Sequence, residues 1–336
     1  MVEFREMRKN ELKNWNDLLE KASFSSIFHT LEWLKVAEKH TNAKLYPLVA
    51  LKGEEIISIF PIFYKKKGFL KMILSPPPKT GIPYLGPVFL NYEKQKQDKK
   101  ESILTDFAVG FDSFLTNNLK ANYILLISPP GQIDCRNFKW RGYSPEPFFT
   151  YFIPIHDGTE KCWKQLKKNV RNDITRGERG GVTFREGGKD EALIIYDSLH
   201  ERFKEQGMEF PLTKRYFIDI FNEFYPEKLR IFVINYKGDI VGGLIMVLYK
   251  DLASHWQGAA KTNVKGVALT DFLQWNTIKW SIENNYKRYE LLGANTQRLC
   301  QFKSKYNPQL EIYFQLKKSS FLAGISEKIY LKWLKR

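Results

Sequence analysis

The chain has 336 residues, of which 43% are apolar and 15% aromatic, so it can fill a hydrophobic core and is not disordered along its length. Lys and Arg number 53 against 37 Asp and Glu, and this excess of 16 positive charges favours polyanionic partners: nucleic acid, phosphorylated substrates or an anionic membrane surface. A solvated basic surface is the alternative explanation. No apolar run reaches the length of a spanning helix and no secretion signal opens the sequence, so we expect a cytoplasmic protein.

The first half of the chain predicts a helix, a β-hairpin, a second helix and a strand. Apolar spacing of three and four around 31–37 indicates the first helix, and residues 44–65 alternate on either side of Gly53, as in strand, turn and strand. We expect the charged segment 93–101 to be a solvated loop or helix end. A helix over 103–119 then leads to a strand at 123–128.

The middle of the chain predicts a strand at 148–155 and the clearest helix, over 160–176. In this helix Trp163, Leu166, Val170 and Ile174 fall on one stripe, and lysines cover the rest. A further helical pattern around 216–224 precedes a second hairpin.

The last third predicts a strand at 252–257, a loop over 258–269 and a helix over 269–284. Residues 289–292 and 312–316 suggest a final pair of strands. The tail over 321–336 is predicted to be an amphipathic basic helix, either docked on the protein or in contact with a membrane surface.

An internal repeat organises these elements. The hairpin at 44–65 matches a second one at 228–250, including the Gly-acid turn and the Tyr-Lys ending, and each hairpin follows a helix. Duplication of one α/β unit explains this best, with chance similarity of two common hairpins as the alternative. We therefore expect two related lobes.

Familiar catalytic motifs are missing from the sequence. There is no Walker loop, GxSxG elbow or HExxH motif, and the five histidines and three cysteines are dispersed, so no metal site and no disulfide framework is expected. We expect a reaction that depends on positioning and electrostatic stabilisation, with no cofactor.

Three basic features are candidates for binding an anion. The loop over 258–269 carries Lys261, Lys265 and Gly266 at a predicted helix N-terminus, where backbone N–H groups favour phosphate. Lys303 and Lys305 follow the strand that ends near 293, at an edge where α/β sheets bind ligands. The segment 161–189 holds nine basic residues against three acidic ones, including Lys167, Lys168 and Arg171. Ordinary surface lysines are the alternative in each case.

The stretch 269–306 resembles the second lobe of the Fem-type peptidoglycan bridge aminoacyltransferases, which belong to the GNAT superfamily. The similarity lies in Leu-x-x-x-Leu-Gln-Trp-x-x-Ile-Lys-Trp at 269–280, Tyr-Lys-Arg-Tyr at 286–289, Leu-Gly at 292–293 and Phe-Lys at 302–303. Further agreement comes from 28–35, which read Phe-His-Thr-Leu-Glu-Trp-Leu-Lys, and from the Gly-Pro-Val at 86–88.

The resemblance implies an α/β (α+β) fold of two tandem GNAT-like acyltransferase lobes with mixed, largely antiparallel sheets. It places lobe one at 1–148, joined by a returning segment 315–336, and lobe two at 149–314. It also implies roles for individual residues. The catalytic candidate is Lys303, and the substrate-binding candidates that the resemblance implies are Lys35, His255, Trp256 and Gln257. Asn295 and Lys305 are further substrate-binding candidates, independent of the resemblance.

Two departures from the family pattern restrict this carry-over. The long coiled-coil arm of some members is absent, because only about twenty residues separate Lys189 from Leu212. Phe210 stands where the family has an arginine, which puts phosphate recognition there in doubt. The acceptor therefore need not be a murein precursor.

Three functions remain open. The first is transfer of an aminoacyl group from aminoacyl-tRNA to an amine of a peptide or cell-envelope precursor, without metal. The second is N-acylation from acyl-CoA, with the loop at 261–268 holding the pyrophosphate. The third is a non-catalytic protein that binds polyanions. DNA is not expected as a partner, and peripheral membrane contact through 321–336 is a further expectation.

Overall fold

The computed structural model describes residues 2–132, 134–260 and 268–324. They divide into two compact units, one from the N-terminus to Phe148 with the returning segment from Ile312 onward, the other Phe149–Glu311. Almost all of the predicted phosphate-binding loop at 261–268, with Lys261, Lys265 and Gly266, and most of the predicted tail helix lie outside the described residues.

The sheet of the first unit has the strand order β1-β2-β3-β4-β6-β13, and the short β5 also pairs with β3. Among the described strands of this unit, only β4 and β6 are parallel neighbours. Helix α3 covers one face and approaches β1 so closely that a Cβ at Gly110 would lie 2.2 Å from the Val2 carbonyl oxygen. The elements of this unit are β1 (Val2–Glu6), α1 (Trp15–Glu20), α2 (Leu31–Thr41), β2 (Lys44–Lys52), β3 (Glu55–Lys67), β4 (Leu70–Ser75), β5 (Val88–Phe89), α3 (Gln97–Phe114), β6 (Tyr123–Ile127), α4 (Arg136–Trp140) and β13 (Gln309–Ser319).

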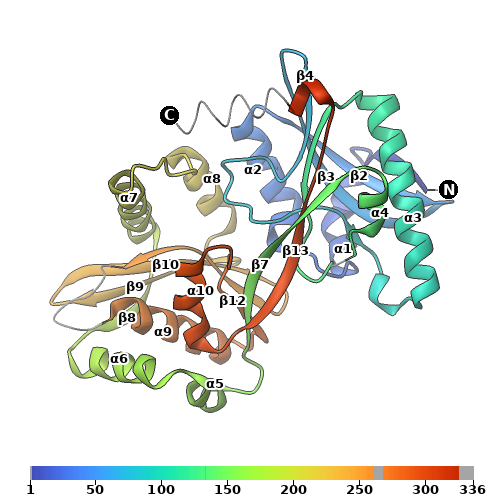
Figure 1. Cartoon of the computed structure of the whole chain (residues 1–336). Helices are drawn as coiled ribbons and strands as arrows, with labels where there is room; N and C mark the ends of the chain where they lie inside the picture. Colours follow the sequence, from blue (N-terminus) through green and yellow to red (C-terminus); the bar gives the residue numbers. More distant parts are fainter. Residues whose placement is uncertain (1, 133, 261–267, 325–336) are drawn as a thin grey trace. The chain divides into compact units, whose positions relative to one another are not determined.

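The second unit repeats this plan in the strand order β8-β9-β10-β11-β12-β7, with β11 and β12 parallel. Helices α6 and α9 lie on one side of the sheet, and α7 and α8 on the other (Figure 1). Its elements are β7 (Ser144–Pro154), α5 (Thr159–Gln165), α6 (Lys168–Arg179), β8 (Thr183–Gly187), α7 (Lys189–Glu205), α8 (Lys214–Phe224), β9 (Leu229–Tyr236), β10 (Asp239–Tyr249), β11 (Leu252–Ala260), α9 (Leu269–Glu283), β12 (Arg288–Glu290) and α10 (Gln297–Lys303).

The predicted hairpin repeat is present, and it extends to a shared irregularity. In the first hairpin Leu51 faces Ile56 and Ala50 faces Ser58, so Ile57 is an extra residue. In the second hairpin Val241 is skipped in the same way, three residues into its strand. A bulge at the same position of both hairpins, within the same strand order, supports duplication of one unit.

The prediction of one continuous helix over 160–176 is wrong, because the structure has two helices there. Leu166 and Lys167 have extended backbone, which separates α5 from α6. The break lets Leu166 enter the core, while the Arg171 guanidinium donates to the Lys164 carbonyl at 2.9 Å and so satisfies the end of α5. The predicted stripe is nonetheless the core-facing side of both helices, and Trp163 contacts Trp275 of α9.

Two further predictions are corrected. Segments 289–292 and 312–316 do not pair with each other: β12 lies between β11 and β7, and β13 pairs with β6 of the first unit. The predicted loop over 258–269 begins too early, because β11 continues through Gly258 to Ala260 along β10.

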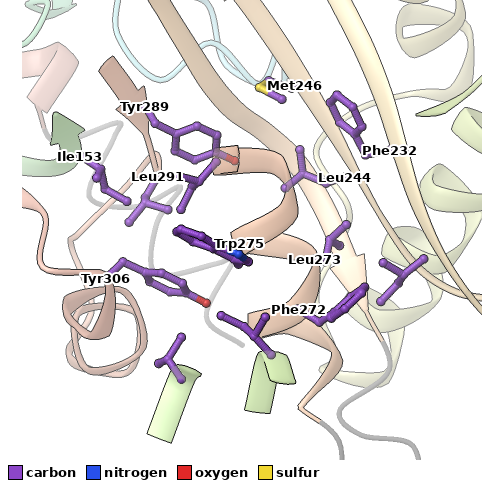
Figure 2. Close-up of a cluster of buried hydrophobic side chains, with 14 of the residues drawn as sticks. Ile153, Phe232, Leu244, Met246, Phe272, Leu273, Trp275, Tyr289, Leu291 and Tyr306 are labelled. Carbon is purple, nitrogen blue, oxygen red and sulfur yellow. The ribbon is translucent and has the colours of Figure 1, made fainter. Parts of the chain in front are cut away.

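A cluster of apolar side chains fills the second unit between its sheet and α5, α6 and α9. Figure 2 shows Trp275 in the middle of this cluster, with Leu291, Leu273 and Tyr306 drawn around it. Tyr289 enters the same cluster from β12 and is fully buried. The cluster fixes β12 and α9, the two elements that position the site described next.

Candidate functional site

The site is built around Lys303, the last residue of α10, at the end of β12. The Lys303 ammonium group is buried and donates to the carbonyl oxygens of Leu292 and, at 2.7 Å, Gly293. Both of these residues have positive φ, 43° and 76°, and such left-handed backbone is strained for a leucine. Strain of this kind is concentrated at functional sites, where it holds backbone groups in an unusual orientation.

The electrostatic state of Lys303 follows from its burial. Desolvation lowers the pKa of its ammonium group to about 8, while the negative charge of Glu290 and the nearby Cys300 act in the opposite direction. At neutral pH the group therefore remains mostly charged, although the protein has removed most of its water. A buried ammonium group with a shifted pKa at a strand end is typical of a functional residue.

Glu290 is the buried counter-charge. It is fully inaccessible to solvent, and its two carboxylate oxygens accept hydrogen bonds from Thr150 of β7 at 2.9 Å and Ser254 of β11 at 3.0 Å. The three residues come from three neighbouring strands, so the sheet itself holds the carboxylate in place. Thr150 also accepts from the Gly293 N–H at 3.3 Å, which connects the carboxylate to the turn that contacts Lys303.

His255 belongs to a second buried network, directed at α9. Its Nδ1 lies 2.9 Å from the side-chain oxygen of Gln274, whose amide nitrogen donates to the Tyr289 hydroxyl at 2.8 Å. The Tyr289 hydroxyl is 3.0 Å from that of Thr277. Desolvation lowers the pKa of His255 to about 4, and the positive charge of Lys303 lowers it further, whereas the hydrogen bond to Gln274 raises it. The imidazole is therefore neutral at physiological pH.

A β-bulge separates His255 from its neighbours. His255 pairs with Met246 of β10, and Gln257 pairs with Ile245, so Trp256 is the extra residue. Trp256 is buried and stacks at 6.4 Å on Phe217 of α8, on the side of the sheet away from α9. His255 and Trp256, two neighbouring substrate-binding candidates, therefore point to different faces of the sheet. Bulges often redirect a side chain beside a functional site.

Lys305, two residues after Lys303, is held in a different way. Its ammonium group forms an ion pair at 2.8 Å with Asp271, a carboxylate in the first turn of α9 that is 2% exposed. The Tyr306 hydroxyl also donates to Asp271. These contacts attach the end of α10 to α9, so Lys305 has a structural partner that the sequence does not reveal.

The remaining predicted residues are dispersed. Asn295 accepts from the Phe149 N–H at 2.8 Å and so fastens the turn after β12 to β7. Lys167 and Lys168 are exposed between α5 and α6, whereas Arg171 is engaged with the α5 carbonyl. Lys35 is exposed on α2 of the first unit, and Phe210 is buried against Tyr196 and Phe203. Of the predicted residues, Lys303 and His255 are linked by the electrostatic effect of the ammonium group on the imidazole.

Sequence reasoning missed four contributors to the site: Glu290, Ser254, Thr150 and Gln274. Glu290 stands in a strand that otherwise reads as buried, and a carboxylate in such a strand is the one local signal that points to it. Within the described residues, no group of His, Cys, Asp and Glu is arranged to hold a metal ion. No described helix combines the length and apolarity that a bilayer requires.

The comparisons with known proteins agree with this architecture. A family model described as an acetyltransferase (GNAT) domain matches residues 164–304, which include Lys303 and His255. The matched residues lie within the second unit. We conclude that the protein is an acyltransferase. A search of curated proteins finds no match.

Solved structures similar to the chain include a tandem GNAT protein. The crystal structure of FemX has a TM-score of 0.69 at 12% identity and covers 93% of this chain and 96% of its own. The structure of L-PGS from Bacillus licheniformis has a TM-score of 0.56 at 13% identity and covers 99% of this chain and 98% of its own. A tandem GNAT protein from the clavulanic acid biosynthesis pathway has a TM-score of 0.51 at 9% identity and covers 95% of this chain and 99% of its own. The predicted Fem-like, two-lobed fold is confirmed.

Proposed function

We propose that the protein transfers an aminoacyl group from aminoacyl-tRNA to an amine of a peptide or cell-envelope precursor, in the manner implied by its Fem-like resemblance. The observation that carries this proposal is Lys303, a charged ammonium group buried at the end of β12. Acyl transfer develops negative charge on the carbonyl oxygen of the ester, and a fixed cation in a dry site stabilises that charge. The fold shared with FemX supports the assignment.

The chemistry balances without a cofactor. The amine nitrogen attacks the ester carbonyl carbon, the new C–N bond forms, the C–O bond to the ribose breaks, and the proton lost by the amine ends on the ribose oxygen. Lys303 donates two of its three N–H groups to the carbonyl oxygens of Leu292 and Gly293, and these two hydrogen bonds fix the direction of the third N–H. That third N–H is the one that we assign to the developing oxyanion.

The basic surface of α5 and α6 supports aminoacyl-tRNA as the donor. Lys164, Lys167 and Lys168 are exposed there, and Arg176 and Arg179 extend the charge along α6. A polynucleotide backbone is the polyanion that such an extended surface suits, because each neutralised phosphate releases counterions. A charged tRNA would place the reaction in the cytoplasm, at the inner membrane face when the acceptor is lipid-linked.

Acyl-CoA is the second candidate donor, and the description of the matched domain as an acetyltransferase favours it. Both donors present a carbonyl to an amine and both carry phosphates, so Lys303 serves either one. The reaction products differ, because one donor adds an amino-acid residue and the other adds a simple acyl group.

The deciding experiment is a product screen by mass spectrometry. The purified protein is incubated with a small-molecule extract and either total tRNA charged with isotopically labelled amino acids or labelled acetyl-CoA. We expect labelled products that are heavier than the acceptor by one amino-acid residue. These products should not form when the charged tRNA is treated with ribonuclease before the reaction. Products that carry only the acetyl label and resist ribonuclease would overturn the aminoacyl-tRNA assignment in favour of acyl-CoA.

A further inference from the structure

We propose that the Nε2 atom of His255 is the hydrogen-bond acceptor that receives an N–H of the attacking amine. This inference rests on the proposed transfer to an amine and extends it, because it names the side chain that holds the nucleophile. It is carried by the hydrogen-bond network behind His255, which leaves Nε2 as an acceptor.

The network fixes which ring nitrogen carries the proton. The Thr277 hydroxyl donates to the backbone carbonyl of Gln274 at 2.9 Å, so its oxygen is left to accept from the Tyr289 hydroxyl. The Tyr289 oxygen in turn accepts from the Gln274 amide nitrogen at 2.8 Å. The Gln274 oxygen therefore faces Nδ1 of His255 at 2.9 Å as an acceptor, and Nδ1 must carry the hydrogen.

The consequence is a lone pair on the other ring nitrogen. With hydrogen on Nδ1, a neutral imidazole has an unprotonated Nε2 that accepts hydrogen bonds. Nε2 of His255 has no hydrogen-bond partner among the residues that the structure describes, and the residue as a whole is partly exposed. A buried relay that ends in an unused, oriented acceptor is suited to hold a donor group of a substrate.

Gly258 lies directly beside the Nε2 atom of His255. A Cβ built on this glycine would lie 2.7 Å from His255 Nε2 and 3.2 Å from the Gly243 carbonyl oxygen. A side chain at this position would therefore displace the imidazole ring or cover its Nε2 atom. The φ of Gly258 is not in the left-handed region, so backbone conformation does not require glycine at this position.

The charge of the site selects the form of the amine. The positive charge of Lys303 acts on His255, so it also disfavours a second cation beside the ring. The amine is therefore held uncharged, with its own lone pair free to attack the ester carbonyl. As the C–N bond forms, one N–H of the amine stays hydrogen-bonded to Nε2 and is kept in the amide product. The other proton of the nitrogen is transferred to the ribose oxygen.

The first test is nuclear magnetic resonance of the protein with ¹⁵N-labelled histidines, of which there are five. We expect His255 to show a protonated Nδ1 and an unprotonated Nε2 between pH 6 and pH 9. The probe is 2,2,2-trifluoroethylamine, a primary amine that is uncharged at neutral pH. It should shift the Nε2 resonance saturably, and trifluoroethyl methyl ether, which has no N–H, should not.

The second test uses variants chosen by shape. His255→Asn keeps a donor near Nδ1 for Gln274 but removes Nε2, and we expect amine transfer to fall about 10- to 100-fold, with more donor ester lost to water. His255→Gln returns an acceptor oxygen near Nε2 and should recover several-fold. Gly258→Ala should abolish the trifluoroethylamine shift while the ring keeps its Nδ1 proton.

The outcomes separate the two proposals. A hydrogen on Nε2, an unmoved Nε2 resonance, or equal transfer by His255→Asn and the wild type overturns the assignment of His255. The resonance measurements require neither tRNA nor a known acceptor. Failure of every donor to give a product therefore refutes the proposed reaction alone, and the His255 assignment is still decided by the amine titration.

Discussion

Replacement of Lys303 by methionine separates a catalytic role from a structural one, because the burial of this ammonium group works against folding. Its pKa falls from 10.5 to about 8 in the folded protein. At about 1.4 kcal/mol per pKa unit, keeping the charge in the folded state costs about 3 kcal/mol. Methionine has a similar length and no charge, so Lys303→Met removes this cost together with the hydrogen bonds to Leu292 and Gly293.

The direction of the pH dependence follows from linkage. Between pH 8 and pH 10.5 the unfolded chain holds a proton that folded Lys303 has lost, so stability of the wild type rises with pH in this window. Lys303→Met lacks this gain. We expect the unfolding free energy of the variant at pH 7 to be within about 1 kcal/mol of the wild type or above it, and the wild type to gain about 3 kcal/mol relative to it by pH 10.5.

The matched control is Lys305→Met, two residues away. Lys305 pairs with Asp271, which is 2% exposed, so its removal leaves a buried carboxylate unpaired and should lower the unfolding free energy by about 3 kcal/mol. Denaturant titrations followed by tryptophan fluorescence at pH 7 and pH 10 measure both variants. The reasoning is refuted if Lys303→Met loses as much stability as Lys305→Met, since Lys303 would then be a structural residue.

Three further predictions concern neighbouring residues. Glu290→Gln removes the negative charge that raises the pKa of Lys303, so the alkaline limb of the rate-against-pH profile should move to lower pH. If the alkaline limb does not move, the titration of Lys303 is not its cause. Lys167→Ala combined with Lys168→Ala should reduce the slope of log binding constant against log salt for tRNA by about 1 to 2, and an unchanged slope places the RNA elsewhere. Gly177→Ala puts a Cβ 2.7 Å from the Phe272 ring, so it should destabilise by about 1–3 kcal/mol in thermal unfolding, which wild-type stability would contradict.

The elements that were predictable carry local signals. The hairpins at 44–65 and 228–250 have a glycine turn and alternating side chains, and the structure has β2–β3 and β9–β10 there. Helix α9 was predicted from its periodic apolar positions to within one residue of its observed bounds, Leu269–Glu283. Repetition of the same local pattern also made the duplicated fold accessible from the sequence alone.

The features that were not predictable depend on distant partners. The break at Leu166 requires a core that accepts this side chain and an Arg171 that satisfies the freed carbonyl. The neighbours of β12 are set by pairing across more than one hundred residues, for which a short strand carries no signal. Periodicity likewise cannot tell a surface Lys303 from a buried one, because the difference lies in the turn at Leu292 and Gly293.

The central claim is that the second unit uses Lys303 to move an aminoacyl group onto an amine. The most direct measurement is the rate at which labelled aminoacyl residues pass from charged tRNA to amine-bearing peptidoglycan or peptide acceptors, compared between the wild type, Lys303→Met and Lys303→Arg at equal folded concentration. We expect transfer by the wild type, a loss of about 10²- to 10³-fold in Lys303→Met and partial recovery in Lys303→Arg. Equal transfer rates in all three proteins would contradict the account.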